Sequence, residues 1–257
     1  MRGTWARRCT AVLLGALLCT APSRVLAQRG RGQPGTPPTP RGSAPVDLTG
    51  YWVSIVTEDW LYRMVTAPKG DHPGVPLNAE GTRVANSWDP ARDEAAGDQC
   101  KAYGAAGVMR APGRLRITWA DDNTMKLETE AGTQTRLFRF NPPPAGGPPT
   151  WQGDSSSVWE LAGGGRRGRA AAAGGSLKVV TTRMRSGYAM KNGVPYGENA
   201  VLTEYVSRTN EPNGDSYLIV TSIIEDSQYF TQPFIRSTHF KKLPDGSAWT
   251  PEPCSAR

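Results

Sequence analysis

Residues 114–140 read RLRITWADDNTMKLETEAGTQTRLFRF and contain the clearest structural pattern in this 257-residue chain. Large apolar side chains alternate with polar ones over 114–119 and again over 125–130. Turn-forming residues follow each run, at 121–123 and at 131–132. A period of two places alternate side chains on opposite faces of a strand. We therefore expect three antiparallel strands joined by short turns.

Seven further segments are enriched in Val, Ile, Thr, Tyr and Trp and lie between Gly, Asn, Asp or Pro residues, as strands do. They are 51–56, 60–66, 157–161, 177–183, 200–208, 216–225 and 234–241. One helix is expected from Asn78, which can cap it, to Trp88, because the residue before Pro90 avoids the α region. A second helical turn is expected within 91–98.

This order of elements indicates a mainly β fold without βαβ alternation. We expect an antiparallel meander closed into a lipocalin-like barrel of about 8–10 strands with one or two short helices, because closure removes exposed strand edges. A two-sheet sandwich is the alternative.

The N-terminal 27 residues have the pattern of a secretory signal peptide: arginines, a short apolar run, and the small-residue site Val25-Leu26-Ala27. Two other interpretations, a lipid-anchored Cys19 and a twin-arginine signal at Arg7-Arg8, match their patterns less well. Residues 28–45 are rich in Pro and Gly and predict a disordered tether, which leaves 46–257 as a single barrel domain. We expect a periplasmic or secreted protein with no transmembrane segment after cleavage.

Net charge indicates which partners to expect, and cysteine content indicates the compartment. The chain has 30 Lys and Arg against 23 Asp and Glu, but seven of the arginines lie in 1–45, so the expected domain is neutral. A nucleic-acid partner is therefore not expected. Cys100 and Cys254 remain in the mature chain as an even pair, and we predict a disulfide between them in an oxidising compartment.

The triplet Gly50-Tyr51-Trp52 resembles the Gly-x-Trp opening of lipocalin-like barrels, in which the Trp closes one end of the barrel. More of the chain resembles a group of uncharacterised secreted bacterial proteins. The segments that carry this resemblance are 77–81, 88–91, Cys100, 109–112, 151–153, 159–160, 225–226 and 229–234. The resemblance implies a barrel outside the cytoplasm and no particular activity.

Motifs for cofactors and metals are not found in the sequence. The chain has two histidines and no Cys-x-x-Cys or His-x-x-x-His spacing, so no metal is expected. Its glycine runs do not match nucleotide-binding patterns, and no Gly-x-Ser-x-Gly is present, so no cofactor and no serine nucleophile are expected.

His239 is the candidate catalytic residue, because it alternates with Ile235 and Ser237 and could point into a barrel. Glu58 and Glu204 are the carboxylates that could pair with it for proton transfer. The alternative is a structural histidine in a strand.

Several aromatic residues could line a ligand pocket or fill the core. The candidate ligand-binding residues are Trp60, Tyr62, Trp119, Tyr205 and Tyr217. The leading hypothesis is a barrel that binds a small hydrophobic molecule. The alternatives are a cofactor-independent isomerase, hydratase or lyase using His239, and a non-catalytic envelope or interaction protein with a solid barrel. Whether the chain is an enzyme, and its oligomeric state, stay open.

Overall fold

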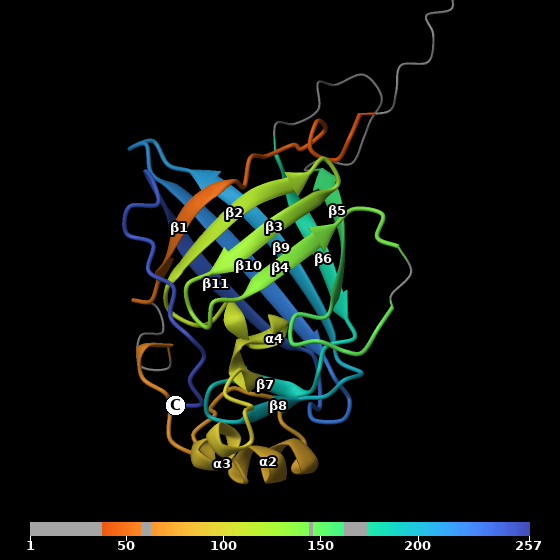
Figure 1. The fold of residues 1–257 in the computed structure, drawn as a ribbon, viewed down its shortest axis with the longest axis vertical. Helices are drawn as coiled ribbons and strands as arrows, with labels where there is room; N and C mark the ends of the chain where they lie inside the picture. Colours follow the sequence, from red (N-terminus) through yellow and green to blue (C-terminus); the bar gives the residue numbers. More distant parts are fainter. Residues whose placement is uncertain (1–37, 58–62, 144–145, 162–173) are drawn as a thin grey trace, which may run out of the picture. The chain divides into compact units, whose positions relative to one another are not determined.

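The computed structural model describes residues 38–57, 63–143, 146–161 and 174–257 (Figure 1). The predicted signal peptide and residues 28–37 of the predicted tether lie outside these ranges. The strands are β1 (Gly50–Ile55), β2 (Arg114–Asp121), β3 (Thr124–Thr129), β4 (Thr135–Arg139), β5 (Asp154–Leu161), β6 (Gly175–Thr182), β7 (Gly187–Met190), β8 (Val194–Tyr196), β9 (Val201–Asn210), β10 (Ser216–Glu225) and β11 (Phe234–Leu243). The helices are α2 (Ala79–Asn86), α3 (Pro90–Ala95), the 3-10 turn η1 (Lys101–Tyr103) and α4 (Ala105–Val108).

Nine of the strands close into a barrel in the order β1-β11-β10-β9-β6-β5-β4-β3-β2, while β7 and β8 form a separate two-stranded sheet. The barrel expected from the sequence is thus confirmed, and the sandwich is excluded. The meander 114–140 forms β2, β3 and β4, with Ile117 opposite Leu127 and Leu127 opposite Arg136.

One junction of the barrel departs from the expected antiparallel pattern. Strands β4 and β5 pair in parallel over only two residue pairs, Phe138 with Ser155 and Arg139 with Ser156. A parallel neighbour requires the chain to return to the same end of the wall, and residues 140–153 make this long connection. We call this junction the seam. Its described parts, 140–143 and 146–153, lie beside β5 and β6 at the right of Figure 1.

Apolar side chains fill most of the lumen. Phe138, Leu177, Leu218, Val220 and Phe240 are almost completely buried and belong to one cluster of core residues. Burial of such side chains stabilises the fold by roughly 1.5–3 kcal/mol each. The lumen is therefore a packed core along much of its length.

Trp52, from the Gly-x-Trp triplet, is buried in this core near one end of the barrel. Its side chain is fully buried and its Nε1 donates to the Leu48 carbonyl at 3.1 Å. The cationic groups of Arg208 and Lys242 lie 5.9 and 5.3 Å from its ring centre. Burial lowers the pKa of Lys242, and the nearby Arg208 lowers it further.

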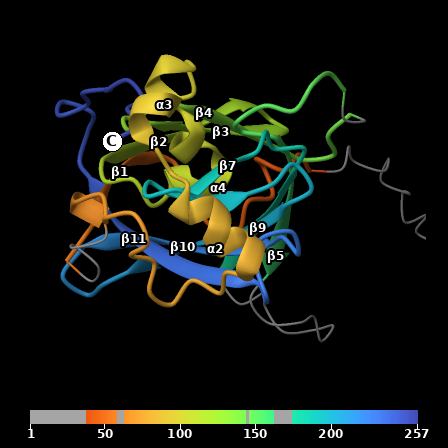
Figure 2. The same cartoon turned by 90° about the horizontal axis from the view of Figure 1, so that it is seen from below.

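Helix α4, β7 and β8 close the opposite end, which we call the helix end (Figure 2). All four residues of α4 are buried, and Arg236, on β11, donates from Nη2 to the Ala106 carbonyl at 3.1 Å. Tyr196, on β8, packs so closely against Gly104 that a Cβ at this position would clash with its hydroxyl. A side chain larger than hydrogen at Gly104 would therefore force Tyr196 or the neighbouring backbone to move.

The short helices lie close to their predicted positions. Asn78 caps α2, accepting from Gly81 N at 2.8 Å, and Asp89 caps α3, in which Pro90 is the first residue. Within the described ranges, no helix has the length and apolar character needed to cross a bilayer.

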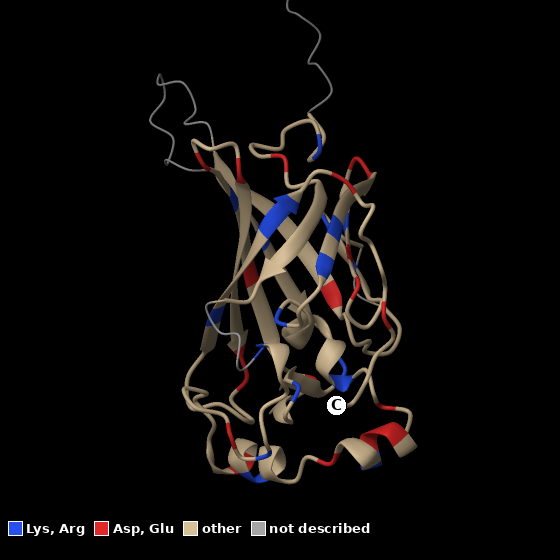
Figure 3. Cartoon of the chain, turned by 90° about the vertical axis from the view of Figure 1, so that its left-hand side faces the viewer, with Lys and Arg blue, Asp and Glu red and all other residues tan. Residues whose placement is uncertain are grey.

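Charged residues of both signs are spread over the barrel and the helix end. In Figure 3, Lys and Arg as well as Asp and Glu are scattered over the strands, the loops and the short helices. This mixture agrees with the neutral charge balance that the sequence gives for residues 46–257. Individual charges and their partners therefore matter more for binding than a field of one sign.

Two local expectations were wrong. The predicted strand 60–66 is not a strand over its described part, 63–66, because the buried Arg63 donates to the carbonyls of Ile55 and Arg110 and turns the chain away from the sheet. Residues 39–45 of the predicted tether contact the barrel rim, where Trp159 Nε1 donates to the Pro40 carbonyl at 2.9 Å. A backbone contact of this kind leaves no hydrophobic signal in the sequence.

Candidate functional site

A charged pair lies inside the barrel between the apolar cluster and the helix end. Glu204, on β9, and Arg136, on β4, are both 1% exposed, with Nη1 to Oε1 at 3.0 Å and Nη2 to Oε2 at 2.5 Å. Thr181 lies 3.4 Å from Arg136 Nη2 and shares a 2.8 Å hydrogen bond with Ser155. Each carboxylate oxygen of Glu204 accepts from Arg136, so this carboxylate is committed to the ion pair and not to a histidine.

His239 does not face the lumen. On β11, Thr238 and Phe240 are buried, whereas His239 lies on the opposite face with the exposed Ile235 and Ser237. Its Nε2 lies 3.4 Å from Ser237 Oγ on the outer wall. The predicted pairing of His239 with Glu204 is therefore wrong, because the barrel wall separates their side chains. The third candidate, Glu58, lies outside the described residues.

The three predicted ligand-binding aromatics that the structure describes do not line one pocket. Trp119 packs in an aromatic cluster, with ring centres 5.9 Å from Phe140 and 6.5 Å from Trp159. Tyr205 and Tyr217 alternate with buried aliphatic residues and lie on the outer wall. Trp60 and Tyr62 lie outside the described residues. Of the predicted aromatics that the structure describes, only Trp119 therefore faces the core.

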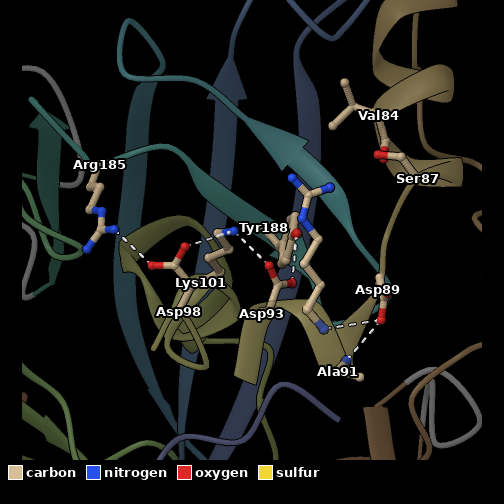
Figure 4. A network of polar contacts seen from close by, with 10 residues as sticks. Val84, Ser87, Asp89, Ala91, Asp93, Asp98, Lys101, Arg185 and Tyr188 are labelled. Atoms are coloured by element: carbon tan, nitrogen blue, oxygen red, sulfur yellow. Dashed lines mark hydrogen bonds and ion pairs between the residues drawn. The ribbon is translucent and has the colours of Figure 1, made fainter. Parts of the chain in front are cut away.

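A network of charges links the elements of the helix end to one another (Figure 4). Lys101 Nζ lies 2.7 Å from Asp93 and 3.1 Å from Asp98, and Tyr188 donates to Asp93 at 2.9 Å. Burial tends to lower the pKa of Lys101, but its hydrogen bonds to Asp93 and Asp98 outweigh this and raise it. Burial, and then the bond to Asp93, raise the pKa of Tyr188. These groups hold each other and the elements α3, η1 and β7 in place.

The predicted disulfide is confirmed beside this network. Cys100 and Cys254 are bonded, with Cα atoms 5.1 Å apart. The bond joins the turn that leads into α4 to the C-terminal segment, which is also held by Glu252 N donating to the Glu130 carbonyl at 3.0 Å. The disulfide and the charge network therefore stabilise the same closed end.

The cavity beside α4 is too small for an organic ligand. It has a volume of about 30 Å³ and is bordered by Ala102, Gly107, Met190 and Asn192 among others. That space holds about one water molecule. A ligand of ordinary size therefore has no room in this cavity.

A larger hollow lies on the outer wall at the seam, with a volume of about 470 Å³. This is within the range of about 300–1,000 Å³ that is usual for small-molecule sites. We call it the seam groove. Its lining residues come from β4, β5, β6 and the connection after β4: Arg139, Pro142, Pro143, Gly146, Asp154, Ser155, Ser156, Val180 and Thr182.

Of the two charged residues that line the seam groove, Asp154 has an ion-pair partner and Arg139 has none among the described residues. Asp154 lies 3.2 Å from Arg183 Nε, and Arg183 also donates to the Gly147 carbonyl, which fixes the connection against β6. Arg139 is half-buried, and within the described part of the chain its side chain has no hydrogen-bond or ion-pair partner. The groove therefore presents a guanidinium whose donors are not occupied by any described residue.

The backbone is strained on both sides of the seam groove. Among the described residues other than glycine, only Thr133, Asn141 and Arg183 have positive φ, and the last two, both at 53°, flank the groove. Asparagine tolerates this region, but an arginine there costs about 1 kcal/mol. Strain of this kind tends to occur at binding sites, where the surrounding structure maintains it.

No sequence pattern singled out Arg139, Asp154 or Arg183. The prolines after Arg139 do not belong to any predicted strand, and the seam is formed by strands that the sequence does not show to be neighbours. Within the described ranges, no group of three or more His, Cys, Asp or Glu residues could hold a metal ion.

No known family model, curated protein or solved structure matches this chain. Its function is therefore inferred from the geometry of the described residues.

Proposed function

We propose that this chain is an exported, non-catalytic binding protein that holds a small molecule in the seam groove on the outside of its barrel. The observation that carries this proposal is the contrast between a lumen filled by side chains and an open hollow of about 470 Å³ at the seam. The disulfide is compatible with a periplasmic or extracellular location.

This proposal moves the ligand expected from the sequence from the lumen to the wall. A hydrophobic molecule in the lumen would have to displace α4 or fully buried residues such as Leu218 and Phe240, at the cost of their packing. The seam groove offers apolar contacts at Val180, Pro142 and Pro143 without such displacement.

The non-catalytic assignment is supported by the arrangement of the candidate proton-transfer groups. His239 lies on the outer wall and Glu204 is held by Arg136 in the lumen, so the proton-transfer pair expected from the sequence is not assembled. Nothing among the described lining residues of the seam groove replaces it, because Asp154 is paired with Arg183. Binding is the function that these residues support best.

The test is a fragment screen by NMR with a variant that blocks the groove. Val180→Trp adds bulk to the groove, and Val53→Trp, at a half-buried residue on β1, is the matched control. We expect bound fragments to shift the backbone amides of Ser156 and Val180 in the native protein and in Val53→Trp, but not in Val180→Trp.

Three results would overturn the proposal: fragments that shift the lumen amides of Leu218 and Phe240 instead, fragment binding that survives Val180→Trp, or no fragment binding to the native protein.

A further inference from the structure

Arg139 differs from the other arginines on this part of the barrel wall. Arg114 lies 3.2 Å from Glu130, Arg116 lies 2.7 Å from Glu128, and Arg183 has Asp154. Each of these cations has an acidic neighbour across the strands or beside the seam. Arg139, at the end of β4, faces Thr124 on β3 and Ser156 on β5, neither of which carries a charge.

The surroundings of Arg139 favour an anion. A half-buried guanidinium loses part of its hydration. A carboxylate or phosphate can replace the lost hydrogen bonds, because two of its oxygens accept from two guanidinium N–H groups in a bidentate pair. The acid that lines the groove, Asp154, is held by Arg183 and does not compete for Arg139. The hydroxyl residues Ser156 and Thr182 also line the groove and can donate to an anionic oxygen.

The remaining lining residues favour an apolar body for the same ligand. Val180, Pro142 and Pro143 have no side-chain hydrogen-bonding groups, and proline also has no backbone N–H. A molecule that fits this lining has one anionic end and one apolar end.

We propose that the seam groove binds a small carboxylic acid with an apolar body, and that Arg139 binds its carboxylate. This inference rests on the proposed function, because it assigns a ligand class to the same groove. It assigns to Arg139 the role of selecting charged over neutral ligands of the same shape.

The experiment compares phenylacetate with phenylacetamide, which have the same shape and differ in charge. Binding of each is followed by NMR shifts of Ser156, Val180 and Thr182 in the native full chain, in Arg139→Gln and in Arg139→Lys. Arg92→Gln, an exposed arginine on α3, is the control. Thermal unfolding of each variant confirms that it is folded.

We expect the acid to bind the native protein about tenfold more tightly than the amide, from the energy of a charge-assisted hydrogen bond. Arg139→Gln should remove that difference, Arg139→Lys should keep part of it, and Arg92→Gln should leave it unchanged. Removal of the preference by Arg139→Gln alone separates a role in recognition from a general loss of structure.

Two results would overturn the inference. If the amide binds in the groove as well as the acid, or if Arg139→Gln keeps the preference, the assignment of Arg139 fails while the proposed function stands. If neither probe shifts the groove residues, whereas lumen residues respond, both fail.

Discussion

Arg136 and Arg139 lie on the same short strand, β4, but on opposite faces of the barrel wall. Arg136 points into the lumen, is 1% exposed, and is held by both oxygens of Glu204. Arg139 points outward into the seam groove, where the described residues offer its side chain no partner. The protein itself pairs the inner charge, the described residues leave the outer one unpaired, and we propose that a ligand binds there. In our proposal the Arg136–Glu204 pair serves the fold, whereas Arg139 at the seam serves binding.

The largest expected effect tests the inner arginine. Glu204→Gln leaves the Arg136 charge buried without its counterion and should lower the free energy of unfolding by roughly 3–5 kcal/mol. Urea unfolding measures this, with Arg139→Gln as the outer-face counterpart, expected to change stability by less than about 0.5 kcal/mol. Similar losses in the two variants would contradict the comparison.

The double variant Arg136→Met with Glu204→Leu refines this test. Replacing both partners with apolar residues removes the unpaired charge, so it should recover most of the stability lost in Glu204→Gln, as urea unfolding would show. If the double variant does not recover this stability, the ion pair contributes more to the fold than the mutual neutralisation of its two charges.

Removal of the disulfide should destabilise the helix end and leave the seam groove protected. Replacing both Cys100 and Cys254 with Ser should cost roughly 2–4 kcal/mol, because the closed loop is long. Hydrogen exchange should show lost protection first in α4, which follows the turn that contains Cys100. Protection at Ser156 and Val180 should be unchanged. Loss at the groove residues before α4 would contradict this assignment of the disulfide to the helix end.

A smaller loss than in these variants is expected for a pair on the outer wall, Arg116 with Glu128. The hydrogen bond from Arg116 holds the pKa of Glu128 below its ordinary value. A lowered folded-state pKa means that the pair stabilises the protein above the unfolded-state pKa, about 4.3, and that this contribution is lost as the pH falls through the folded-state pKa. Glu128→Gln should therefore cost about 0.5–1 kcal/mol near neutral pH and progressively less in acid. Urea unfolding of both proteins across this range measures it, and a cost independent of pH would be inconsistent with the pair.

Local patterns in the sequence predicted much of the barrel. The alternation in 114–140 depends only on neighbouring residues, and β2, β3 and β4 follow it closely. The cap at Asn78 and the pairing of Cys100 with Cys254 likewise follow from residue type and context.

The inner and outer faces of β11 were harder to assign, because both carry residues suited to a strand. Ile235 and His239 suggested an inward face, but the face with Phe234 and Phe240 buries more apolar surface and takes the lumen. One such inversion moved His239 to the outside.

The helix end and the groove depend on contacts between distant segments. Helix α4 consists of Ala105, Ala106, Gly107 and Val108, and is too short to show a helical period. At the seam, β4 and β5 pair in parallel although a long connection separates them in the sequence. No local sequence pattern predicts this pairing. For this reason the candidate site was not predictable from the sequence.

A filled lumen and a ligand site at the seam are most directly tested together, by the NMR response of methyl groups in the native protein to benzene and to phenylacetate. Phe240→Ala is the comparison variant, because it leaves an apolar cavity in the lumen. We expect benzene to shift the lumen methyls of Leu218 and Val220 only in Phe240→Ala, and phenylacetate to shift Val180 in both proteins. Benzene shifts at Leu218 and Val220 in the native protein, with no response of Val180 to phenylacetate, would contradict both.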